Sequence, residues 1–120
     1  MIKQADFEKM RAWIRSSRNL MAPLVTISDP TVIETISFLN PDMIILDMEH
    51  SVMEPRDLQL SVMAAGDIPV LARIRGLEKN EIKKVLDSGS AGIIVPGIEY
   101  LEEVRNCISW SRFPPEGTRG

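Results

Sequence analysis

Four short apolar runs recur along this chain, and the spacing between them limits the folds that it can adopt. Their centres, near Val25, Ile45, Leu71 and Ile94, are separated by 20, 26 and 23 residues. Apolar runs this short are typical of strands that are buried on both faces. Strands that alternate with helical patterns at such intervals are parallel and are joined by right-handed helical crossovers. We therefore predict an α/β fold of parallel βα repeats, with residues 1–120 forming a single domain.

The segments between the runs carry signals of helix starts and ends. Asp29 followed by Pro30 is a cap with proline at the first helical position. Pro55 opens the next helix, and Gly66 ends it. Further helices are expected over residues 5–18, over residues 81–87 and over the segment marked by Leu101, Val104 and Ile108.

Composition argues against several classes of function. Of the 120 residues, 44% are hydrophobic, which is enough for a core in one domain. The 17 acidic and 14 basic residues are interspersed and give a net charge of -3, so no basic surface for nucleic acid is predicted. Cys107 is the only cysteine, which excludes an intrachain disulfide and a cysteine-based zinc site.

Neither the N-terminal segment nor any apolar run has the pattern of export or membrane insertion. Residues 1–18 mix charged and apolar side chains, unlike the uninterrupted apolar core of a signal peptide. No run approaches the ~18 apolar residues that a membrane span needs. We predict a cytoplasmic protein that binds neither nucleic acid nor membrane.

Three side chains that can do chemistry follow the second apolar run. Asp47, Glu49 and His50, the only histidine, cluster where the predicted strand ends. In parallel α/β folds the C-terminal ends of strands carry catalytic groups. Two carboxylates and an imidazole there can act as acid, base or metal ligands. The alternative is a solvated loop entrance with no chemical role.

Two arginines, Arg73 and Arg75, end the third predicted strand at the same edge of the sheet. Residues two apart on a strand point the same way, unless the strand already turns before Arg75. A guanidinium at this position is suited to grip a carboxylate or to stabilise an enolate oxygen. The alternative is a rim charge paired with Glu49 or Asp47.

Asp87 lies near the end of a predicted helix, where an acid is unfavourable for the helix dipole. A tertiary partner such as His50 would explain it, and a plain exposed aspartate is the alternative. The glycine-rich stretch Ser88–Gly92 precedes the fourth strand, so it belongs at the opposite end of the sheet and is a poor candidate for phosphate binding.

Five motifs follow one another along the second half of the second apolar run and beyond. They are Leu46-Asp47-Met48-Glu49-His50, Pro69-Val70-Leu71-Ala72-Arg73, Val85-Leu86-Asp87-Ser88-Gly89, Gly92-Ile93-Ile94-Val95-Pro96 and Arg112-Phe113-Pro114-Pro115-Glu116-Gly117-Thr118-Arg119-Gly120. In this order they resemble the motifs of one family, the HpcH/HpaI aldolases, and the resemblance runs from about Asp29 to Gly120. The family comprises class II pyruvate aldolases such as 2-dehydro-3-deoxyglucarate aldolase and 4-hydroxy-2-oxoheptanedioate aldolase.

The resemblance implies a TIM (β/α)₈ barrel that cleaves 4-hydroxy-2-oxo acids to pyruvate and an aldehyde. It makes His50 the acid/base residue, Arg73 the residue that steadies the carbonyl or enolate oxygen, and Asp87 the partner of the histidine. Asp47 and Glu49 become supporting acids in contact with the substrate. From its place on the strand, Arg75 joins them as a predicted substrate-binding residue.

The resemblance also implies what this chain lacks. The family barrel has eight βα units, and this sequence covers the first four, a half barrel. The family uses a divalent metal, Mg²⁺ or Mn²⁺, whose glutamate and aspartate ligands lie on later strands. We therefore predict no metal site within this chain alone.

Three interpretations follow from these observations. We favour the N-terminal half of an aldolase barrel that is inactive as a fragment and whose complete form takes a pyruvate-type 2-oxo acid. The second is a half barrel that associates with a copy of itself, in line with an expected homo-oligomer. The third is an open α/β sheet that binds a small carboxylate without catalysis.

Overall fold

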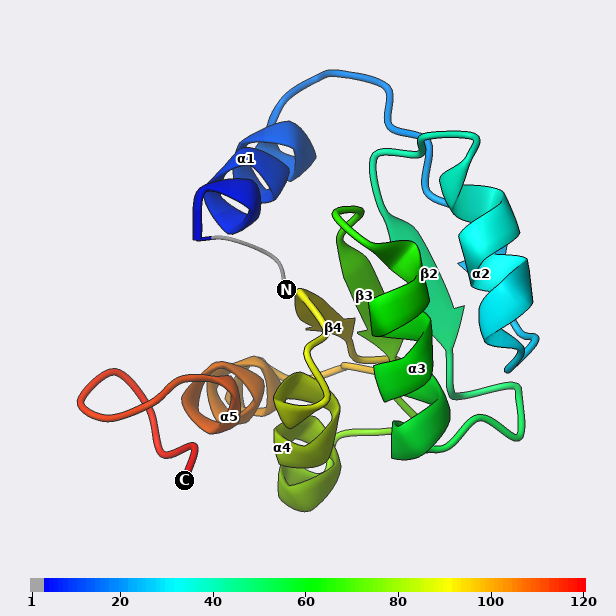
Figure 1. Ribbon diagram of the computed structural model, residues 1–120. Coiled ribbons are helices and arrows are strands. Elements are labelled where there is room, and N and C mark those ends of the chain that lie inside the picture. Colours follow the sequence, from blue (N-terminus) through cyan, green and yellow to red (C-terminus); the bar gives the residue numbers. More distant parts are fainter. Residues whose placement is uncertain (1–3) are drawn as a thin grey trace.

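The computed structural model describes residues 4–120 as one parallel sheet with helices (Figure 1). Four strands alternate with four helices after an N-terminal helix, so the predicted βα repeat is confirmed. The elements in chain order are α1 (Gln4–Arg15), β1 (Leu24–Val25), α2 (Pro30–Ser37), β2 (Ile44–Asp47), α3 (Pro55–Ala65), β3 (Val70–Arg73), α4 (Lys79–Asp87), β4 (Gly92–Ile94) and α5 (Leu101–Ser111).

The strands lie side by side in chain order, β1-β2-β3-β4, and every pair is parallel. Each connection therefore passes through one helix, as expected for parallel neighbours. The first strand has two residues where the sequence indicated five, because only Leu24 and Val25 are in register with β2.

Most helix boundaries follow the capping signals of the sequence. The Asp29 carboxylate accepts the Thr31 amide at 2.8 Å and starts α2. Gly66, at a φ of 63°, ends α3 in a conformation that glycine tolerates best. The start of α4 was missed by two residues, because Glu78 caps it by accepting the amides of Asn80 and Glu81 at 2.9 and 2.7 Å.

The two faces of the sheet are covered differently. Helices α2, α3 and α4 line one face, as Figure 1 shows, and the main core lies between them and the strands. On the other face, Met10 of α1 packs with Met43 and Leu71 in a smaller cluster. The larger core contains Val25, Ile33, Ile44, Leu46, Met48, Met53, Leu58, Ala65, Val70, Ala72, Ile74, Ile82 and Val85.

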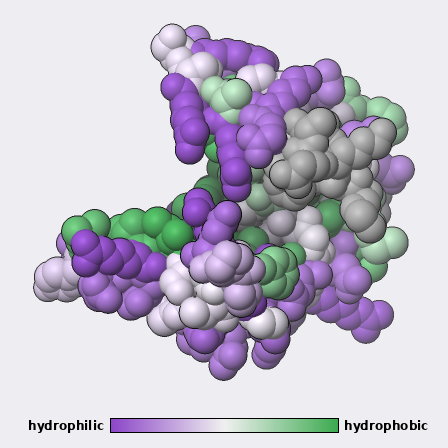
Figure 2. Space-filling view, turned by 90° about the vertical axis from the view of Figure 1, so that its left-hand side faces the viewer, coloured by the Kyte–Doolittle hydropathy of each residue, from purple (hydrophilic) through white to green (hydrophobic). Residues whose placement is uncertain are grey.

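The sheet has two edges at which no further strand is paired among residues 4–120. Leu24 of β1 is 52% exposed at one edge. Beyond the other edge, none of the residues of α5 is buried, and the apolar residues that marked this helix in the sequence, Leu101, Val104 and Ile108, are exposed. Figure 2 looks onto this side and shows apolar surface beside a hollow in the outline of the molecule.

Within residues 4–120, no helix combines the length and the apolar character needed to cross a membrane.

Candidate functional site

Asp47 and Arg73 face each other at the C-terminal ends of two neighbouring strands. They are the last residues of β2 and β3, and the strand register pairs them directly. Arg73 Nε donates to Asp47 Oδ1 at 3.0 Å, and Arg73 Nη2 donates to Asp47 Oδ2 at 2.7 Å. A bidentate contact of this kind fixes the plane of the guanidinium as well as its position.

The Asp47 carboxylate is buried and accepts several hydrogen bonds. Its side chain is 1% exposed, and Oδ1 also accepts the backbone amides of Glu49 and His50 at 3.0 and 3.2 Å. The hydrogen bond from Arg73, against the opposing effect of burial, lowers the pKa of Asp47 to about 2. Asp47 therefore stays charged and shapes the backbone that carries Glu49 and His50.

Glu49 lies between the guanidinium and the imidazole. Its Oε2 is 3.3 Å from Arg73 Nε, and its Oε1 is 3.6 Å from His50 Nε2. The His50 side chain is 70% exposed, so it borders the solvent at this end of the sheet. The expected meeting of His50 and Arg73 at one edge is thus found, with Glu49 as the link between them. Arg73 also forms the pairs with Asp47 and Glu49 that the alternative interpretation named.

One edge of the Arg73 guanidinium is not used by the protein. Asp47 occupies the Nε and Nη2 side, whereas Nη1 has no hydrogen-bond partner among the described residues. Hydrogen bonding to Asp47 raises the pKa of Arg73, and its side chain is 28% exposed. A charged donor pair, Nη1 with the second hydrogen of Nη2, is therefore available to a carboxylate or an enolate oxygen.

Asp47 and Arg75, which were also predicted to bind substrate, are both in contact with protein groups in this chain. Both oxygens of Asp47 are taken by protein donors. Arg75 Nη2 donates to the Met53 carbonyl at 2.7 Å and to Glu54 at 3.0 Å, while Nη1 is 3.5 Å from Glu81. β3 ends at Arg73, so Arg75 lies on the following loop and the alternation of side chains along a strand does not extend to it.

Within this chain Asp87 does not meet His50, so the predicted pairing is not made inside one copy of the chain. It is the last residue of α4, the helix that returns from the C-terminal end of β3 to the start of β4. It therefore lies at the opposite edge of the sheet, where it accepts a hydrogen bond from Arg119 Nη2 at 2.7 Å. The signal was present in the sequence, because Asp87 directly precedes the Ser88–Gly92 stretch that was assigned to that edge.

A hollow of about 930 Å³ also lies at this opposite edge, away from His50 and Arg73. The Ser88–Gly92 stretch lines it together with Arg11, Arg112 and Arg119. Each of these arginines has an acidic neighbour: Glu8 at 3.5 Å, Glu116 at 3.7 Å and Asp87 at 2.7 Å, respectively. Because each positive charge is balanced by a neighbouring carboxylate, the arginines do not make the hollow an anion site.

The residues at the C-terminal edge do not make a metal site by themselves. Among the described residues, no group of three or more histidine, cysteine, aspartate or glutamate side chains is arranged to hold an ion. Both oxygens of Asp47 already accept hydrogen bonds from Arg73, three bonds in all from this part of the chain reaching Oδ1 and one reaching Oδ2. Glu49 offers a single further carboxylate, so an octahedral ion such as Mg²⁺ would need water or ligands from elsewhere to complete its coordination.

Parallel βα units with paired charged groups at the C-terminal ends of the strands define this chain as four units of a TIM barrel, as predicted. Comparison with known proteins identifies the family. The profile of the HpcH/HpaI aldolase/citrate lyase family matches residues 24–120. The chain belongs to this family.

Three relatives illustrate the match. The chain is 33% identical to the 2-dehydro-3,6-dideoxy-6-sulfogluconate aldolase of Pseudomonas putida, over 88% of this chain and 42% of that protein. It is 32% identical to a hydroxypyruvate/pyruvate aldolase of Roseovarius nubinhibens, over 78% and 37%. A crystal structure of a family member from Burkholderia cenocepacia superposes with a TM-score of 0.86 at 22% identity, over 98% and 48%. The chain thus spans less than half the length of these proteins.

Proposed function

We propose that this chain is the N-terminal half of an aldolase that cleaves 4-hydroxy-2-oxo acids to pyruvate and an aldehyde. The observation that carries the proposal is the open edge of Arg73, held in place by buried Asp47 at the end of the sheet that also bears Glu49 and His50. Membership of an aldolase family supports it. The cytoplasmic location predicted from the sequence stays a prediction.

Arg73 is the proposed anchor for the 2-oxo acid. In retro-aldol cleavage the bond between C3 and C4 breaks, and its electron pair forms an enolate across C2 and C3. Negative charge develops on the C2 oxygen, so a fixed cation beside that oxygen lowers the barrier. Asp47 contributes by holding the guanidinium in one orientation, so little reorganisation is needed when the charge appears.

His50 is the proposed proton carrier. Cleavage begins when a base removes the proton of the 4-hydroxyl group, and it ends when the enolate receives a proton at C3. An imidazole near neutral pH can do both steps, and Glu49 Oε1, 3.6 Å from Nε2, can orient the ring. In this proposal Asp87 has no role beside the His50 of the same chain.

The remaining part of the site is proposed to come from the second half of the family barrel. A divalent metal, Mg²⁺ or Mn²⁺, is expected for the complete barrel by resemblance, and the residues described here do not provide its ligands. We expect no pyruvate release from a 4-hydroxy-2-oxo acid by the 120-residue chain with either metal. Metal-dependent turnover by this chain alone would contradict that division of the site.

Pyruvate binding tests the Arg73 anchor without requiring catalysis. Titration of the ¹⁵N-labelled chain with pyruvate should shift the amide signals of Glu49, His50 and Arg73. Arg73→Met should weaken binding by about tenfold or more, the effect expected when a charged donor pair is removed. The control Arg105→Met removes an exposed arginine that pairs with Glu102 at 3.5 Å, and it should leave binding unchanged. Binding that survives Arg73→Met would refute the anchor.

Self-association is a second candidate, favoured by the two edge strands, β1 and β4, whose outer sides are unpaired in the part of the chain that the structure describes. Two copies could pair β4 of one with β1 of the other and close a ring of eight strands. Such closure would cover Leu24 and bring apolar surface near α5 under the partner. Light scattering of the chain should then give twice the monomer mass, and a well-folded monomer at all concentrations would exclude this candidate.

A further inference from the structure

The loop between β2 and α3, residues 48–54, carries His50 and is held at both ends. At its inner end, Asp47 accepts the amides of Glu49 and His50, and the Ser51 hydroxyl donates to the Asp47 carbonyl. Near its outer end, the Met53 amide donates to Ser51 Oγ at 3.1 Å. His50 lies between these two points.

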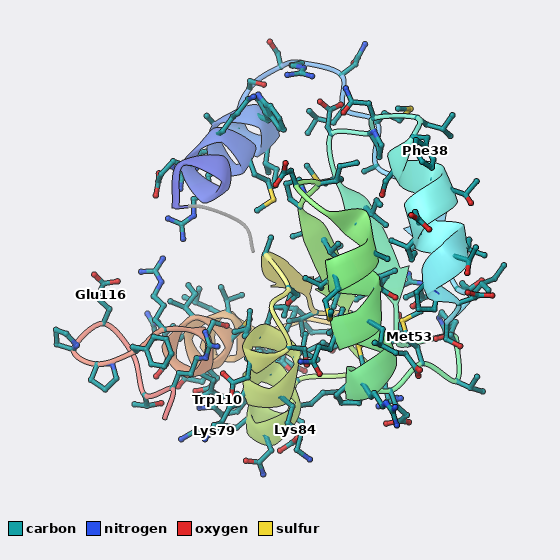
Figure 3. All side chains as sticks on the ribbon, in the orientation of Figure 1. Phe38, Met53, Lys79, Lys84, Trp110 and Glu116 are labelled. Atoms are coloured by element: carbon teal, nitrogen blue, oxygen red, sulfur yellow. The ribbon has the colours of Figure 1, made fainter. Side chains whose placement is uncertain are left out.

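Met53 anchors the outer end of this loop in two ways. Its side chain is fully buried in the larger core, and Figure 3 shows it between α2 and α3. Its carbonyl accepts a hydrogen bond from Arg75 Nη2 at 2.7 Å. A short hydrogen bond from a charged donor is stronger than one between neutral groups, so this contact holds the backbone at Met53 firmly.

Arg75 is in turn held by α4. Glu81, in the first turn of that helix, accepts the Arg75 amide at 3.4 Å and lies 3.5 Å from Nη1. The Glu81 side chain is largely buried, whereas Glu54, the other carboxylate near Arg75, is mostly exposed and contributes less. The His50 loop is thus tied through Arg75 to a helix that follows the next strand.

We propose that Arg75 is a positioning residue: by bonding the Met53 carbonyl and Glu81 together, it sets the conformation of residues 48–54 and holds His50 beside Glu49 and Arg73. This inference deepens the proposed function, because it concerns the placement of the proposed proton carrier. Arg75 does this without touching the substrate.

Amide hydrogen exchange in the full chain tests the proposal at the loop itself. In Arg75→Met, exchange of the Glu49 and His50 amides should become about tenfold faster, as expected when one bond to a charged group is lost. The Ile44 amide, which donates to the Pro69 carbonyl at 2.9 Å in the sheet, is the internal reference and should not change. Arg105→Met is the matched control and should leave all three amides unchanged.

Two further variants keep the test decisive if Arg75→Met folds poorly. Glu81→Gln leaves Arg75 and the loop intact but weakens the tie to α4, so Glu49 and His50 should exchange about threefold faster, a partial loss of the same interaction. Arg75→Lys retains the positive charge but loses the several donors of the guanidinium group, so its exchange rates should lie between those of the wild type and those of Arg75→Met. Exchange that rises equally at Ile44, or at none of these amides, would overturn the proposal.

Pyruvate titration separates this inference from the proposed function. Arg75→Met should change the affinity for pyruvate less than Arg73→Met does, because Arg73 keeps its own contacts with Asp47. If Arg73→Met leaves binding intact while Arg75→Met loosens the loop, the anchor fails and the positioning role stands. If Arg73→Met abolishes pyruvate binding and Arg75→Met leaves the loop amides protected from exchange, the anchor stands and the positioning role fails.

Discussion

Two arginine–aspartate pairs lie at opposite ends of the strands, and the closest distance between charged atoms is the same in both pairs. Arg73 and Asp47 approach to 2.7 Å at the C-terminal edge, and Arg119 and Asp87 approach to 2.7 Å at the N-terminal edge. The Asp47 side chain is 1% exposed and accepts four hydrogen bonds from residues 4–120, whereas that of Asp87 is 49% exposed and accepts one. The distance between charges therefore does not distinguish the two pairs, but their surroundings do.

The difference follows from the elements that carry each pair. Asp47 and Arg73 come from adjacent strands, where the register leaves little freedom. Asp87 ends a helix, and Arg119 lies in the segment after α5, against the ring of Phe113 at 4.5 Å. A pair placed by a sheet can hold a guanidinium for chemistry, whereas a pair between a helix end and a loop mainly ties two surface segments together.

The largest expected contrast is in stability after removal of each carboxylate charge. Asp47→Asn should lower the free energy of unfolding by about 3 kcal/mol, the low end for breaking a buried pair, because Arg73 keeps some access to water. Asp87→Asn should cost less than about 1 kcal/mol. Urea denaturation of both variants measures this. Equal losses would show that the two pairs are energetically alike.

Lowering the pH should remove the contribution of the Asp47–Arg73 pair to the stability of the fold. The pKa of Asp47 is lowered from 3.8 to about 2, so the charged form stabilises the fold above pH 4 and this contribution is lost as the pH falls toward 2. The loss should amount to roughly 2 kcal/mol. Unfolding at pH 7, 4, 3 and 2 should show it in the wild type, and Asp47→Asn should lack this component.

Replacing each arginine by lysine tests whether the pair needs the two-pronged geometry of the guanidinium group or only its positive charge. Arg73→Lys should cost about 1–2 kcal/mol, because one ammonium group cannot make both contacts with Asp47. Arg119→Lys should cost about 0.5 kcal/mol, since a single contact with Asp87 can be kept. Thermal unfolding ranks the two variants, and a larger loss at Arg119 would reverse the comparison.

Salt should produce the smallest contrast. At 1 M NaCl the screening length is about 3 Å, so the cost of Asp87→Asn should shrink by a few tenths of a kcal/mol. The cost of Asp47→Asn should hardly change, because water and ions do not reach its carboxylate. Urea denaturation at 0.1 and 1 M NaCl provides the comparison.

Much of the fold could be read from local patterns. Capping residues such as Asp29 and terminators such as Gly66 act within a few positions of themselves, so they are visible in the sequence. The start of α4 was missed because Glu78 is an uncommon cap whose role depends on the backbone already turning there. Strand lengths were overestimated because pairing partners, and not apolarity, decide where a strand ends.

The sequence could predict which residues gather at the candidate site only where it could predict the strand ends correctly. Asp47 and Arg73 were expected at one edge because parallel strands share their direction. The contacts of Arg75 could not be predicted from strand alternation because the strand ends two residues before it. A tertiary partner was expected for Asp87, but the partner that it has in this chain, Arg119, could not be predicted because it lies 32 residues away.

The sequence by itself determined the order of the elements, the parallel direction of the strands and the edge at which Asp47, Glu49, His50 and Arg73 gather. These features depend on apolar periodicity and capping, which act over a few residues. Only the tertiary structure decided which donor each carboxylate binds, because such contacts join residues far apart in the chain through burial and strand register. Arg73 with Asp47, Arg75 with Met53 and Arg119 with Asp87 are all of this kind.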